Sequence, residues 1–460
     1  MNIDLIVVGS GLAAHRAALV AIEYGASVLM LEKMPSIGGS TVMSGGSFAF
    51  AGTDLQRAAD IDDDADRLRR DLLAVGGGES DPALVDRYVE GQLDEYRFLL
   101  AAGAHFGPVQ ISSGQSVPRS HPAHPRTVLN LLHAKLIASA GAIVWLEARA
   151  MRLRRSDPDG PIDEVLVERD GAQSVVRANH GVILATGGFS RGEDLLKLFV
   201  PTIRAALRAG GPGNEGDGIK MAWEHGAGFA DLGFVKGTFG SYLEVDPVEP
   251  HTTLLPVYRG AIAVNLSGQR FVNESKSYKT LGAACLLQAD ARAFQIFDQH
   301  VIAQSVDGVP SFDFAAALRK QRIFSAPSIG ELAALIGIDP GTLEQTVSDY
   351  NADTRTGRDR KFGRQALAHE YGAIVPIEHG PFYAYPCTTS INSTYAGLRV
   401  RDDMAVLNVW GEALPGLYAA GEVIGGFHGE AYMTGSSLVK ALVFGRIAAE
   451  SVLARMGLSR

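Results

Sequence analysis

The chain has few residues that could build a metal site, a disulfide framework or a haem attachment. It contains only two cysteines, Cys285 and Cys387, among 460 residues. Neither belongs to a CxxC pair or stands near a cluster of histidines, so we expect no metal site and no structural disulfide. No CxxCH motif occurs, so we expect no c-type haem on this chain.

Long apolar runs and clustered basic residues are also missing. No uncharged apolar run reaches the ~18 residues that a membrane-spanning helix requires. The start, MNIDLIVVGSG, has no basic segment before its short apolar run and has a glycine turn after it, which favours a first strand over a signal peptide. The net charge of −9 argues against nucleic-acid binding, which needs clustered Lys and Arg. We therefore expect a cytoplasmic protein with no membrane span and no nucleic-acid partner.

Apolar residues and glycine are abundant instead. Apolar residues make up 46% of the chain, and 53 residues are glycine. A length of 460 residues exceeds one ordinary hydrophobic core, so two or three domains are expected. The many glycines indicate tight turns and places where the backbone approaches a ligand closely.

The segment IDLIVVGSGLAAHRAALVAIEYGASVLMLEK (3–33) has the pattern of a dinucleotide-binding unit: strand, glycine turn, helix and second strand. Gly9 allows the tight turn, Gly11 lets a pyrophosphate approach the helix N-terminus, and Ala14 keeps the helix close to the strand. Glu32 ends the second strand, where its carboxylate can accept hydrogen bonds from a ribose. The predicted contacts are Gly9, Gly11, Leu12, Ala13, Ala14 and Glu32.

A second glycine-rich segment, KMPSIGGSTVMSGGSFAFAGT (33–53), places two glycine pairs among small hydroxyl residues. Such a stretch cannot build a bulky core. It can lay backbone N–H groups against a flat ring system and a phosphate. The predicted contacts are Lys33, Gly38, Gly39, Ser40, Thr41, Ser44, Gly45 and Gly46.

Four later segments add to this pattern: VILATGGFSR (182–191), GNEGDGIKMAWEHGA (213–227), LPGLYAAGEVIGGFHG (414–429) and TGSSLVKALVFGRIAAESVL (434–453). In this order, the motifs resemble the flavoprotein subunits of the fumarate reductase and succinate dehydrogenase family, together with the 3-ketosteroid dehydrogenases. The resemblance runs almost from end to end and implies FAD as the cofactor. Members with covalent FAD have a histidine in the second glycine segment. Here Ser40 and Thr41 stand there, so we expect FAD to bind non-covalently.

The resemblance also assigns FAD contacts in the later motifs. Glu422 is expected to face the ribityl or ribose hydroxyls. The N–H groups of Ser436, Ser437 and Leu438 at a helix N-terminus are expected at the pyrimidine edge of the flavin. The full set of later contacts is Ala185, Thr186, Gly187, Gly188, Asp217, Gly421, Glu422, Ser436, Ser437 and Leu438.

The expected fold is α/β, with a Rossmann-like FAD-binding domain that is split in sequence. Its first part is 1–240 and its second part is 391–460, with an α+β capping or catalytic domain inserted at 241–390. Within the insertion we expect a strand at 261–273 and helices at 279–306, 314–322 and 330–352. A charged helix is expected at 58–72.

The catalytic positions of fumarate reductases are changed in this chain. Those enzymes have a proton-donating arginine four residues after a RF(V/M)NE segment, and here RFVNE (270–274) leads to Tyr278. Their carboxylate-binding histidine and arginine fall on Asn392 or Ser393 in INSTYAGL and on Tyr432 in HGEAYMTG. Planar carboxylates favour guanidinium partners, so these changes argue against a C4-dicarboxylate substrate. Tyr395 is a candidate pocket residue.

The replacements resemble 3-ketosteroid dehydrogenases. The resemblance implies that Tyr278 is the base that takes an α-proton, and that Tyr432 donates to a carbonyl oxygen beside the N–H of Gly435. Arg259 remains from a Glu-x-x-Arg proton relay whose glutamate is replaced by Pro256. Lys276, Lys279 or Arg259 is expected to lower the pKa of Tyr278.

The predicted activity is FAD-dependent dehydrogenation of a CH–CH bond next to a carbonyl, or the reverse ene reduction. The predicted partners are a small-molecule carbonyl substrate and an external electron acceptor or donor, because the chain has no haem motif of its own. One alternative is a fumarate reductase-like or tricarballylate dehydrogenase-like enzyme that acts on a carboxylic acid. Another is a flavin-binding electron carrier without turnover.

Overall fold

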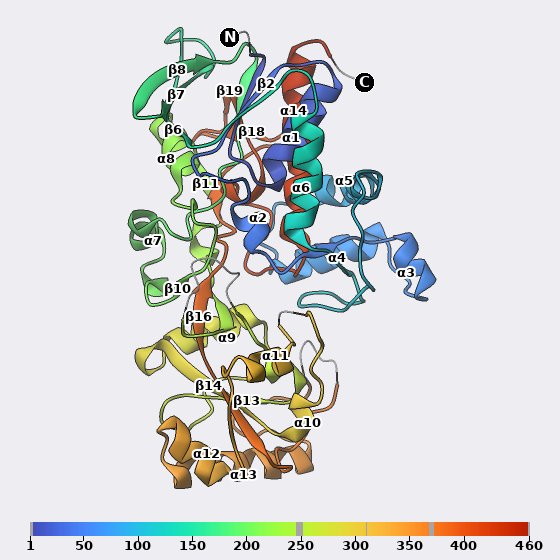
Figure 1. The fold of residues 1–460 in the computed structure, drawn as a ribbon, viewed down its shortest axis with the longest axis vertical. Helices are drawn as coiled ribbons and strands as arrows, with labels where there is room; N and C mark the ends of the chain where they lie inside the picture. The colour runs from blue at the N-terminus through green and yellow to red at the C-terminus, as the bar shows by residue number, and fades with distance from the viewer. Residues whose placement is uncertain (1–2, 245–251, 310, 368–371, 459–460) are drawn as a thin grey trace. The chain divides into compact units, whose positions relative to one another are not determined.

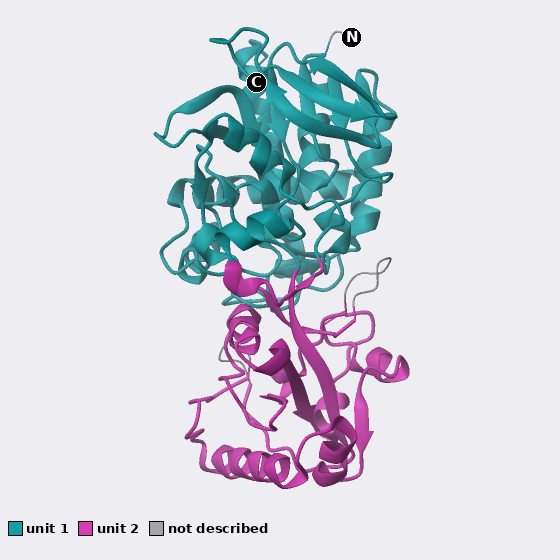
Figure 2. Cartoon of the chain, turned by 90° about the vertical axis from the view of Figure 1, so that its left-hand side faces the viewer, with its two compact units in different colours: residues 1–200, 210–235, 392–460 teal, residues 201–209, 236–391 magenta. Residues whose placement is uncertain are grey.

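The computed structural model describes residues 3–244, 252–309, 311–367 and 372–458 (Figure 1). It divides into two compact units, which Figure 2 distinguishes by colour. Unit 1 comprises Met1–Val200, Gly210–Val235 and Asn392–Arg460, and unit 2 comprises Pro201–Ala209 and Lys236–Ile391. The domain limits at 240/241 and 390/391 stay a prediction. The contacts divide the chain at 235/236 and 391/392 and also place 201–209 in unit 2.

Unit 1 is built on a six-stranded sheet with the order β18-β19-β9-β1-β2-β5. Strand β1 pairs in parallel with β2 and β9, and only β18 runs antiparallel to its neighbour. Strands β1, β2 and β9 are buried along their whole length, as in a parallel sheet covered on both faces. The expected α/β fold class is confirmed. The strands are β1 (Leu5–Val8), β2 (Val28–Leu31), β5 (Ala142–Trp145), β9 (Gly181–Leu184), β18 (Ala405–Leu407) and β19 (Ala413–Ala419).

Three helices pack side by side along this sheet: α1 (Leu12–Glu23), α6 (Pro125–Ile137) and α14 (Ser436–Arg455) (Figure 1). Helix α5 (Pro82–Ala101) packs against α14 as well. The carboxylate of Glu95 on α5 is fully buried and accepts hydrogen bonds from Arg16 on α1 at 2.7 Å and from Arg446 on α14 at 2.7 Å. One buried carboxylate therefore ties α1, α5 and α14 together.

The helix expected at 58–72 is present only from Ala65 on. The chain forms α3 (Asp54–Ala58) and α4 (Ala65–Val75), with a break between them. At the break Asp60 has a left-handed φ of 56°, which a helix interior does not tolerate. Asp64 then starts α4 by accepting a hydrogen bond from the Arg67 N–H at 2.7 Å. The aspartates of this stretch therefore start a new helix.

Unit 2 is built around β16 (Phe382–Ile391), which pairs with β10 (Leu207–Arg208), β12 (Thr238–Ser241), β14 (Arg292–Phe297) and β15 (Phe324–Ala326). Strand β13 (Ile262–Val264) pairs with β14. Helices α12 (Ile329–Ile336) and α13 (Pro340–Thr356) contact each other, and α12 contacts β15 and β16. The expected helix at 330–352 is present as this pair, and α11 (Phe314–Arg319) lies within the expected 314–322.

The helix expected at 279–306 is interrupted by a strand, and the strand expected at 261–273 is too long. Helix α9 (Tyr278–Leu286) ends before a turn in which Asp290 and Ala291 have positive φ, and β14 follows. The RAFQIF sequence of β14 contains four apolar residues, and the pairing of this strand with β13 and β16 overrides the helix pattern. Strand β13 stops at a turn where the Gly268 N–H donates to the carbonyl of Asn265 at 2.9 Å.

The remaining described elements are short or lie at the edges of the two units. In the part of the chain that the structure describes, no helix combines the length and the apolar character needed to cross a membrane. The other helices and strands are α2 (Ser40–Met43), α7 (Glu193–Phe199), α8 (Asp217–Glu224), α10 (Gln299–Ile302), β3 (Ser47–Ala49), β4 (Ser120–Pro122), β6 (Ala148–Arg154), β7 (Glu164–Arg169), β8 (Ala172–Arg177), β11 (Phe229–Ala230) and β17 (Gly397–Leu398).

The crossing of α1 and α14 gives a test of the packing. A Cβ at Gly445 would lie 2.5 Å from the carbonyl oxygen of Ala13. Helix propensity alone predicts that Gly445→Ala stabilises α14 by about 1 kcal/mol. We predict the opposite, a loss of roughly 1–3 kcal/mol in the free energy of unfolding, because the helices must separate. Chemical denaturation measures the change.

Gly330→Ala on α12 is the matched control. Its Cβ would meet only the flexible carboxylate end of Glu344, so we expect no loss of stability. A stabilised Gly445→Ala variant would contradict the close crossing.

Candidate functional site

The loops after β1 and β9 approach each other closely at Gly9. A Cβ there would lie 2.3 Å from the carbonyl oxygen of Ala185, and Gly9 has a φ of +112°, so only glycine fits. After β2, the Glu32 carboxylate accepts hydrogen bonds from the Ser10 hydroxyl and from the Met34 N–H, the latter at 2.8 Å. The strand, turn, helix and acidic strand end of the fingerprint are thus assembled in unit 1.

The second glycine segment lies against the start of α1. The Leu12 N–H donates to Thr41 Oγ1 at 3.1 Å, and a Cβ on Gly211 would lie 2.7 Å from the Ser40 nitrogen. By contrast, a Cβ on Gly39 or Gly45 would meet no heavy atom within 4 Å. These two glycines therefore border open space.

The carboxylate of Glu422 joins three segments of unit 1. It accepts from the Thr394 N–H at 3.0 Å and from Asn214 Nδ2 at 3.4 Å, and it also hydrogen-bonds with Ser40. Asn214 donates to Ser40 Oγ at 2.6 Å as well. A Cβ on Gly188 would lie 2.5 Å from this carboxylate, so the Gly187–Gly188 turn makes its position possible. Burial raises the pKa of Glu422, and these hydrogen bonds act in the opposite direction.

Two predicted FAD contacts bind each other. Lys33 Nζ lies 2.8 Å from the Asp217 carboxylate and 2.8 Å from that of Glu215. Arg149 lies 3.2 Å from Asp217 on the other side. This ion-pair group fixes the loop after β2 to the start of α8.

Two of the three predicted N–H donors at the start of α14 have partners within the chain. The Ser436 N–H donates to the Met433 carbonyl at 3.2 Å, and its hydroxyl donates to the same oxygen at 2.7 Å. The Ser437 backbone hydrogen-bonds with Tyr432, and the Leu438 N–H is a further first-turn donor of the helix. The contacts of these three residues with the flavin stay a prediction.

The residues present fit a dinucleotide such as FAD. Helices α1 and α14 begin after Gly11 and Gly435 and have no side-chain cap, whereas Asp64 and Asp81 cap α4 and α5. Uncapped N-termini of this kind favour phosphate and other anionic groups. The Thr186 hydroxyl, in the loop after β9, is buried and has no hydrogen-bond partner among the described residues. The cradle thus offers donors, open space at Gly39 and Gly45, and an acidic strand end at Glu32.

Tyr432 and Gly435 lie together before α14, but not as two donors that converge on one ligand oxygen. The Gly435 N–H donates to Tyr432 Oη at 3.0 Å. Burial raises the pKa of Tyr432, which keeps the phenol neutral, while the Gly435 hydrogen bond lowers the pKa in part. The phenol hydrogen, backed by this N–H, is therefore the group that can act as a donor.

Two aromatic residues surround Tyr432. The Tyr395 ring stacks on it, with ring centroids 4.6 Å apart and planes 15° from parallel. His428 meets both rings edge-on, at 4.8 Å from Tyr395 and 5.4 Å from Tyr432. Both tyrosines are partly buried, and His428 is buried. Tyr395, a pocket candidate from the sequence, thus belongs to the surroundings of Tyr432.

Tyr278 is the first residue of α9 in unit 2. The hydroxyl of Ser277 caps this helix by accepting from the Lys279 N–H at 3.3 Å. Lys279 is almost fully buried, and its Nζ lies 5.5 Å from the centre of the Tyr278 ring. That Nζ donates to Thr238 Oγ1 at 2.9 Å and to the Lys236 carbonyl at 3.3 Å, whereas Lys276 is exposed. Of the three cations expected near Tyr278, Lys279 is the one for which the structure shows a contact.

Arg259 ends the short helix η3 (Pro256–Arg259) in unit 2. Its guanidinium lies 4.5 Å from the centre of the Phe312 ring, and Tyr278 and Phe312 pack against the same hydrophobic cluster. Arg259 Nε is buried without a hydrogen-bond partner in the described ranges, and burial lowers the pKa of this group. No contact with Tyr278 is shown, so its part in proton transfer stays a prediction.

A buried ion network, which sequence reasoning missed, holds the RFVNE segment that precedes Tyr278. Arg270 lies 2.6 Å from Glu274 and 2.9 Å from Asp359, and Glu274 lies 3.6 Å from Arg364. Arg364 also donates to the carbonyls of Val257 and Ala261, at 2.7 Å and 2.9 Å. Asp359 and Arg364 lie in the basic stretch 355–364, whose composition alone indicates a solvated loop.

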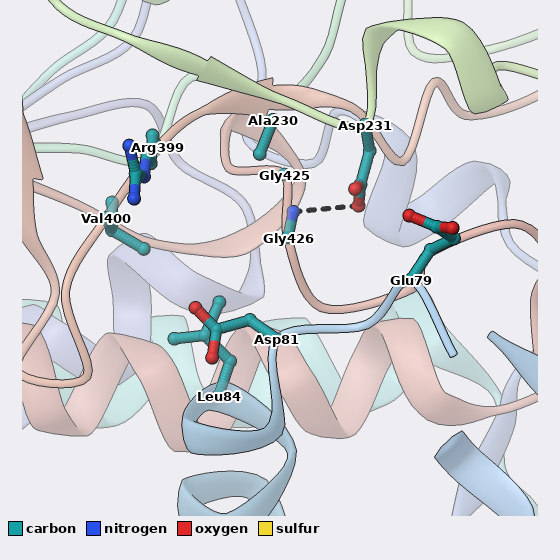
Figure 3. Close-up of a pocket in the computed structure, with 9 residues that line it drawn as sticks. All are labelled: Glu79, Asp81, Leu84, Ala230, Asp231, Arg399, Val400, Gly425 and Gly426. Carbon is teal, nitrogen blue, oxygen red and sulfur yellow. Dashed lines mark hydrogen bonds between the residues drawn. The ribbon is translucent and has the colours of Figure 1, made fainter. Parts of the chain in front are cut away.

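A cavity of about 250 Å³ lies in unit 1, and none of the predicted site residues lines it. Figure 3 shows Asp231 accepting from the Gly426 N–H, at 2.7 Å, beside Glu79, with Arg399 on the other side of Gly426.

Lys440 is almost fully buried, and its Nζ has no hydrogen-bond partner in the described part of the chain. Burial lowers the pKa of Lys440 to about 8, against the opposing charges of Glu422 and Asp231.

The sequence profile of the FAD binding domain family matches residues 4–438. An NADH:fumarate oxidoreductase of Klebsiella pneumoniae is 30% identical over 98% of this chain, and the chain spans 48% of that protein. Relatives named urocanate reductase, from Eggerthella lenta, and vinyl phenol reductase, from Lactiplantibacillus plantarum, are 28% and 29% identical. The relatives named here are thus all oxidoreductases.

Two solved structures are similar over 98% of this chain. A flavocytochrome c3 fumarate reductase matches with a TM-score of 0.83 and 26% identity over 78% of its own chain. A 3-ketosteroid-Δ4-(5α)-dehydrogenase of Rhodococcus jostii matches with a TM-score of 0.77 and 26% identity over 96% of its chain. Both branches of the resemblance seen in the sequence are therefore found among proteins similar to this chain.

The open space at Gly45 gives a test of the cradle. A side chain there meets no protein atom, so Gly45→Val should leave the free energy of unfolding of the apoprotein within about 0.5 kcal/mol. The same side chain would occupy space assigned to FAD. We expect the dissociation constant for FAD to rise roughly tenfold or more, as measured by flavin fluorescence titration.

Gly233→Val is the control, because Gly233 also faces open space but is not among the predicted FAD contacts. It should leave both quantities unchanged. Unchanged FAD affinity in the Gly45→Val variant would show that the cradle is assigned to the wrong loop.

Lys440 gives a prediction on pH. Its pKa in the folded chain, about 8, lies below the ordinary 10.5, so the unfolded chain binds the extra proton between these values. The free energy of unfolding should therefore rise with pH across about 8–10.5, and the burial penalty is fully present below pH 8. Lys440→Met should remove this rise and stabilise the protein at pH 7 by roughly 1–3 kcal/mol.

Urea denaturation of both proteins at several pH values measures the difference between them. Lys220→Met, at a partly exposed residue of α8 that pairs with Asp194, controls for the loss of one charge. A stability difference between wild type and Lys440→Met that does not vary with pH would contradict the assignment.

Proposed function

This chain belongs to the FAD binding domain family of FAD-dependent oxidoreductases, and we propose that it acts on a CH–CH bond next to a carbonyl group. The reaction is α,β-dehydrogenation of a ketone or the reverse reduction of an enone. One observation carries this proposal: the neutral Tyr432 phenol, backed by the Gly435 N–H, stands before the helix expected at the flavin. A neutral phenol suits a ketone oxygen, whereas a carboxylate favours a guanidinium.

The chain's own residues divide the work on the substrate. FAD, when bound, supplies the acceptor or donor of the hydride at the β-carbon. Glu32 and the N–H groups of Ser437 and Leu438 are the groups that would hold it. Tyr432 donates to the carbonyl oxygen and stabilises the negative charge that develops there as the α-carbon loses its proton. This makes the α-proton acidic enough for a side-chain base.

Tyr278 is the proposed base for the α-proton. The ammonium of Lys279 lies 5.5 Å from the centre of its ring, which places a positive charge near the proposed base. The ion network of Arg270, Glu274 and Asp359 fixes the segment before it, which suits a group that must be held in one position. In the reductive direction Tyr278 returns the proton.

Relatives named for the reduction of fumarate, urocanate and vinyl phenol support chemistry at a carbon–carbon double bond. The ketosteroid dehydrogenase supports a ketone substrate. The proposed partners are a small carbonyl compound and an external electron acceptor or donor.

An anaerobic screen of the flavin absorbance tests the proposal. We expect cyclic ketones to bleach the oxidised flavin, or enones to reoxidise the reduced flavin, while succinate and tricarballylate have no effect. Bleaching by polycarboxylates alone would favour the carboxylic-acid alternative. No response to any compound by protein that holds FAD would favour an electron carrier.

Tyr278→Phe tests the base. We expect the rate of flavin reduction by an active ketone to fall at least about 10²-fold, with the FAD content unchanged, because the phenol oxygen that accepts the proton is lost. Tyr383→Phe is the control, since the Tyr383 hydroxyl bonds Gln299 in unit 2 at 3.0 Å and has no proposed role. Normal rates in the Tyr278→Phe variant would refute this assignment.

A further inference from the structure

Tyr395 has a backbone conformation that a bulky residue rarely adopts. Its φ is +55°, in the left-handed region, where a non-glycine residue is under strain. Such strain persists only where the surrounding structure enforces it, and it gathers at ligand-binding sites. The enforcing contacts come from the preceding residue. The Thr394 N–H donates to Glu422 at 3.0 Å, and Thr394 Oγ1 accepts from the Phe189 N–H at 3.4 Å.

The strained backbone directs the Tyr395 ring onto Tyr432. The two rings are nearly parallel at 4.6 Å, and the edge of His428 closes one side of the pair. The Tyr395 side chain also hydrogen-bonds with Tyr432, the proposed carbonyl donor. Flat aromatic faces thus stand immediately beside the group that would hold a substrate carbonyl.

The groups that contact Tyr432 include two aromatic rings, those of Tyr395 and His428, and the backbone N–H of Gly435. Aromatic faces attract other flat, conjugated groups through offset stacking and dispersion. A saturated dicarboxylate gains little from such a surface, because its charges would lose hydration without a guanidinium partner.

We propose that the stacked rings of Tyr395 and Tyr432, bordered by His428, form an aromatic shelf that binds a flat conjugated ring next to the reacting bond. The substrate class is then ring-conjugated carbonyl compounds, and Tyr395 is a residue that determines specificity. This inference rests on the proposed function for the reaction, but the binding step can be measured without turnover.

The probe is acetophenone, added to the oxidised holoenzyme. It has an aromatic ring and a carbonyl but no β-carbon outside the ring, so it can be neither dehydrogenated nor reduced at an isolated double bond. Pinacolone, an aliphatic methyl ketone of similar bulk, is equally inert and serves as the matched ligand. Perturbation of the flavin absorbance gives both dissociation constants. We expect acetophenone to bind about 3–10-fold more tightly than pinacolone.

Two variants test the role of Tyr395. Tyr395→Gly removes the ring and accepts the left-handed backbone without strain, so the FAD content should be retained. It should bring the two dissociation constants to within about twofold of each other. Tyr395→Phe keeps the ring face and should keep the preference for acetophenone. Tyr383→Phe serves as the control for loss of a hydroxyl elsewhere.

Equal binding of both ketones by the wild-type protein would overturn the shelf, and that comparison decides the matter even if Tyr395→Gly loses FAD. Equal weakening of both ketones in Tyr395→Gly, with FAD retained, would show a purely structural role. A retained acetophenone preference that depends on Tyr395, with no flavin redox response to any ketone or enone, would support the shelf and refute the proposed function. Turnover of ketones without any preference for acetophenone would support the proposed function and refute the shelf.

Discussion

The carboxylate of Glu422 is the constraint on which the arrangement of the site depends. It receives hydrogen bonds from Thr394, Asn214 and Ser40, which belong to three segments far apart in the sequence. A buried carboxylate that lost these donors would carry a large desolvation cost, so the three segments are held where the donors reach it. The same hydrogen bond from Thr394 fixes the backbone that turns the Tyr395 ring onto Tyr432. Cofactor cradle and aromatic shelf are therefore positioned by one acidic group.

Several buried charges in the described part of the chain come with partners, whereas the Nζ of Lys440 has no hydrogen-bond partner there. Glu95 is held by Arg16 and Arg446, and Arg119 lies 2.6 Å from Asp63. Such pairs contribute little net stability, but removing one member is costly, so they fix the elements that carry them. Lys440 has opposing carboxylates only at longer range, and its pKa falls accordingly. A charge kept in this position, one turn into the helix that begins at Ser436, is energetically unfavourable for the folded chain.

The sequence was sufficient where the structure depends on local rules. The GxGxxA turn requires glycine at residue 9 and a small residue at Ala14, so strand β1, helix α1 and strand β2 could be placed from the pattern alone. Strand β14 could not, because its apolar residues are compatible with a helix and only pairing with β13 and β16 decides between them. Asp359 and Arg364 were missed for a related reason. Their ionic partners, Arg270 and Glu274, lie about 90 residues earlier in the chain, as the separation of 89 residues between Arg270 and Asp359 shows.

The candidate site, too, could be predicted from the sequence only in part. The type of residue at 278 and 432 could be read from the sequence, but the direction of the hydrogen bond between Gly435 and Tyr432 depends on the left-handed turn at Gly435, where φ is +91°. That direction changes the chemistry. Two donors that converge on a carbonyl oxygen would share its charge, whereas here the N–H donates to the phenol, so the phenol alone is the proposed donor to the substrate. A hydrogen bond accepted by the phenol oxygen strengthens the one that its hydrogen donates, because each polarises the other. In the proposed reaction, the peptide group of Gly435 therefore contributes to charge stabilisation through Tyr432 and does not have to reach the substrate itself.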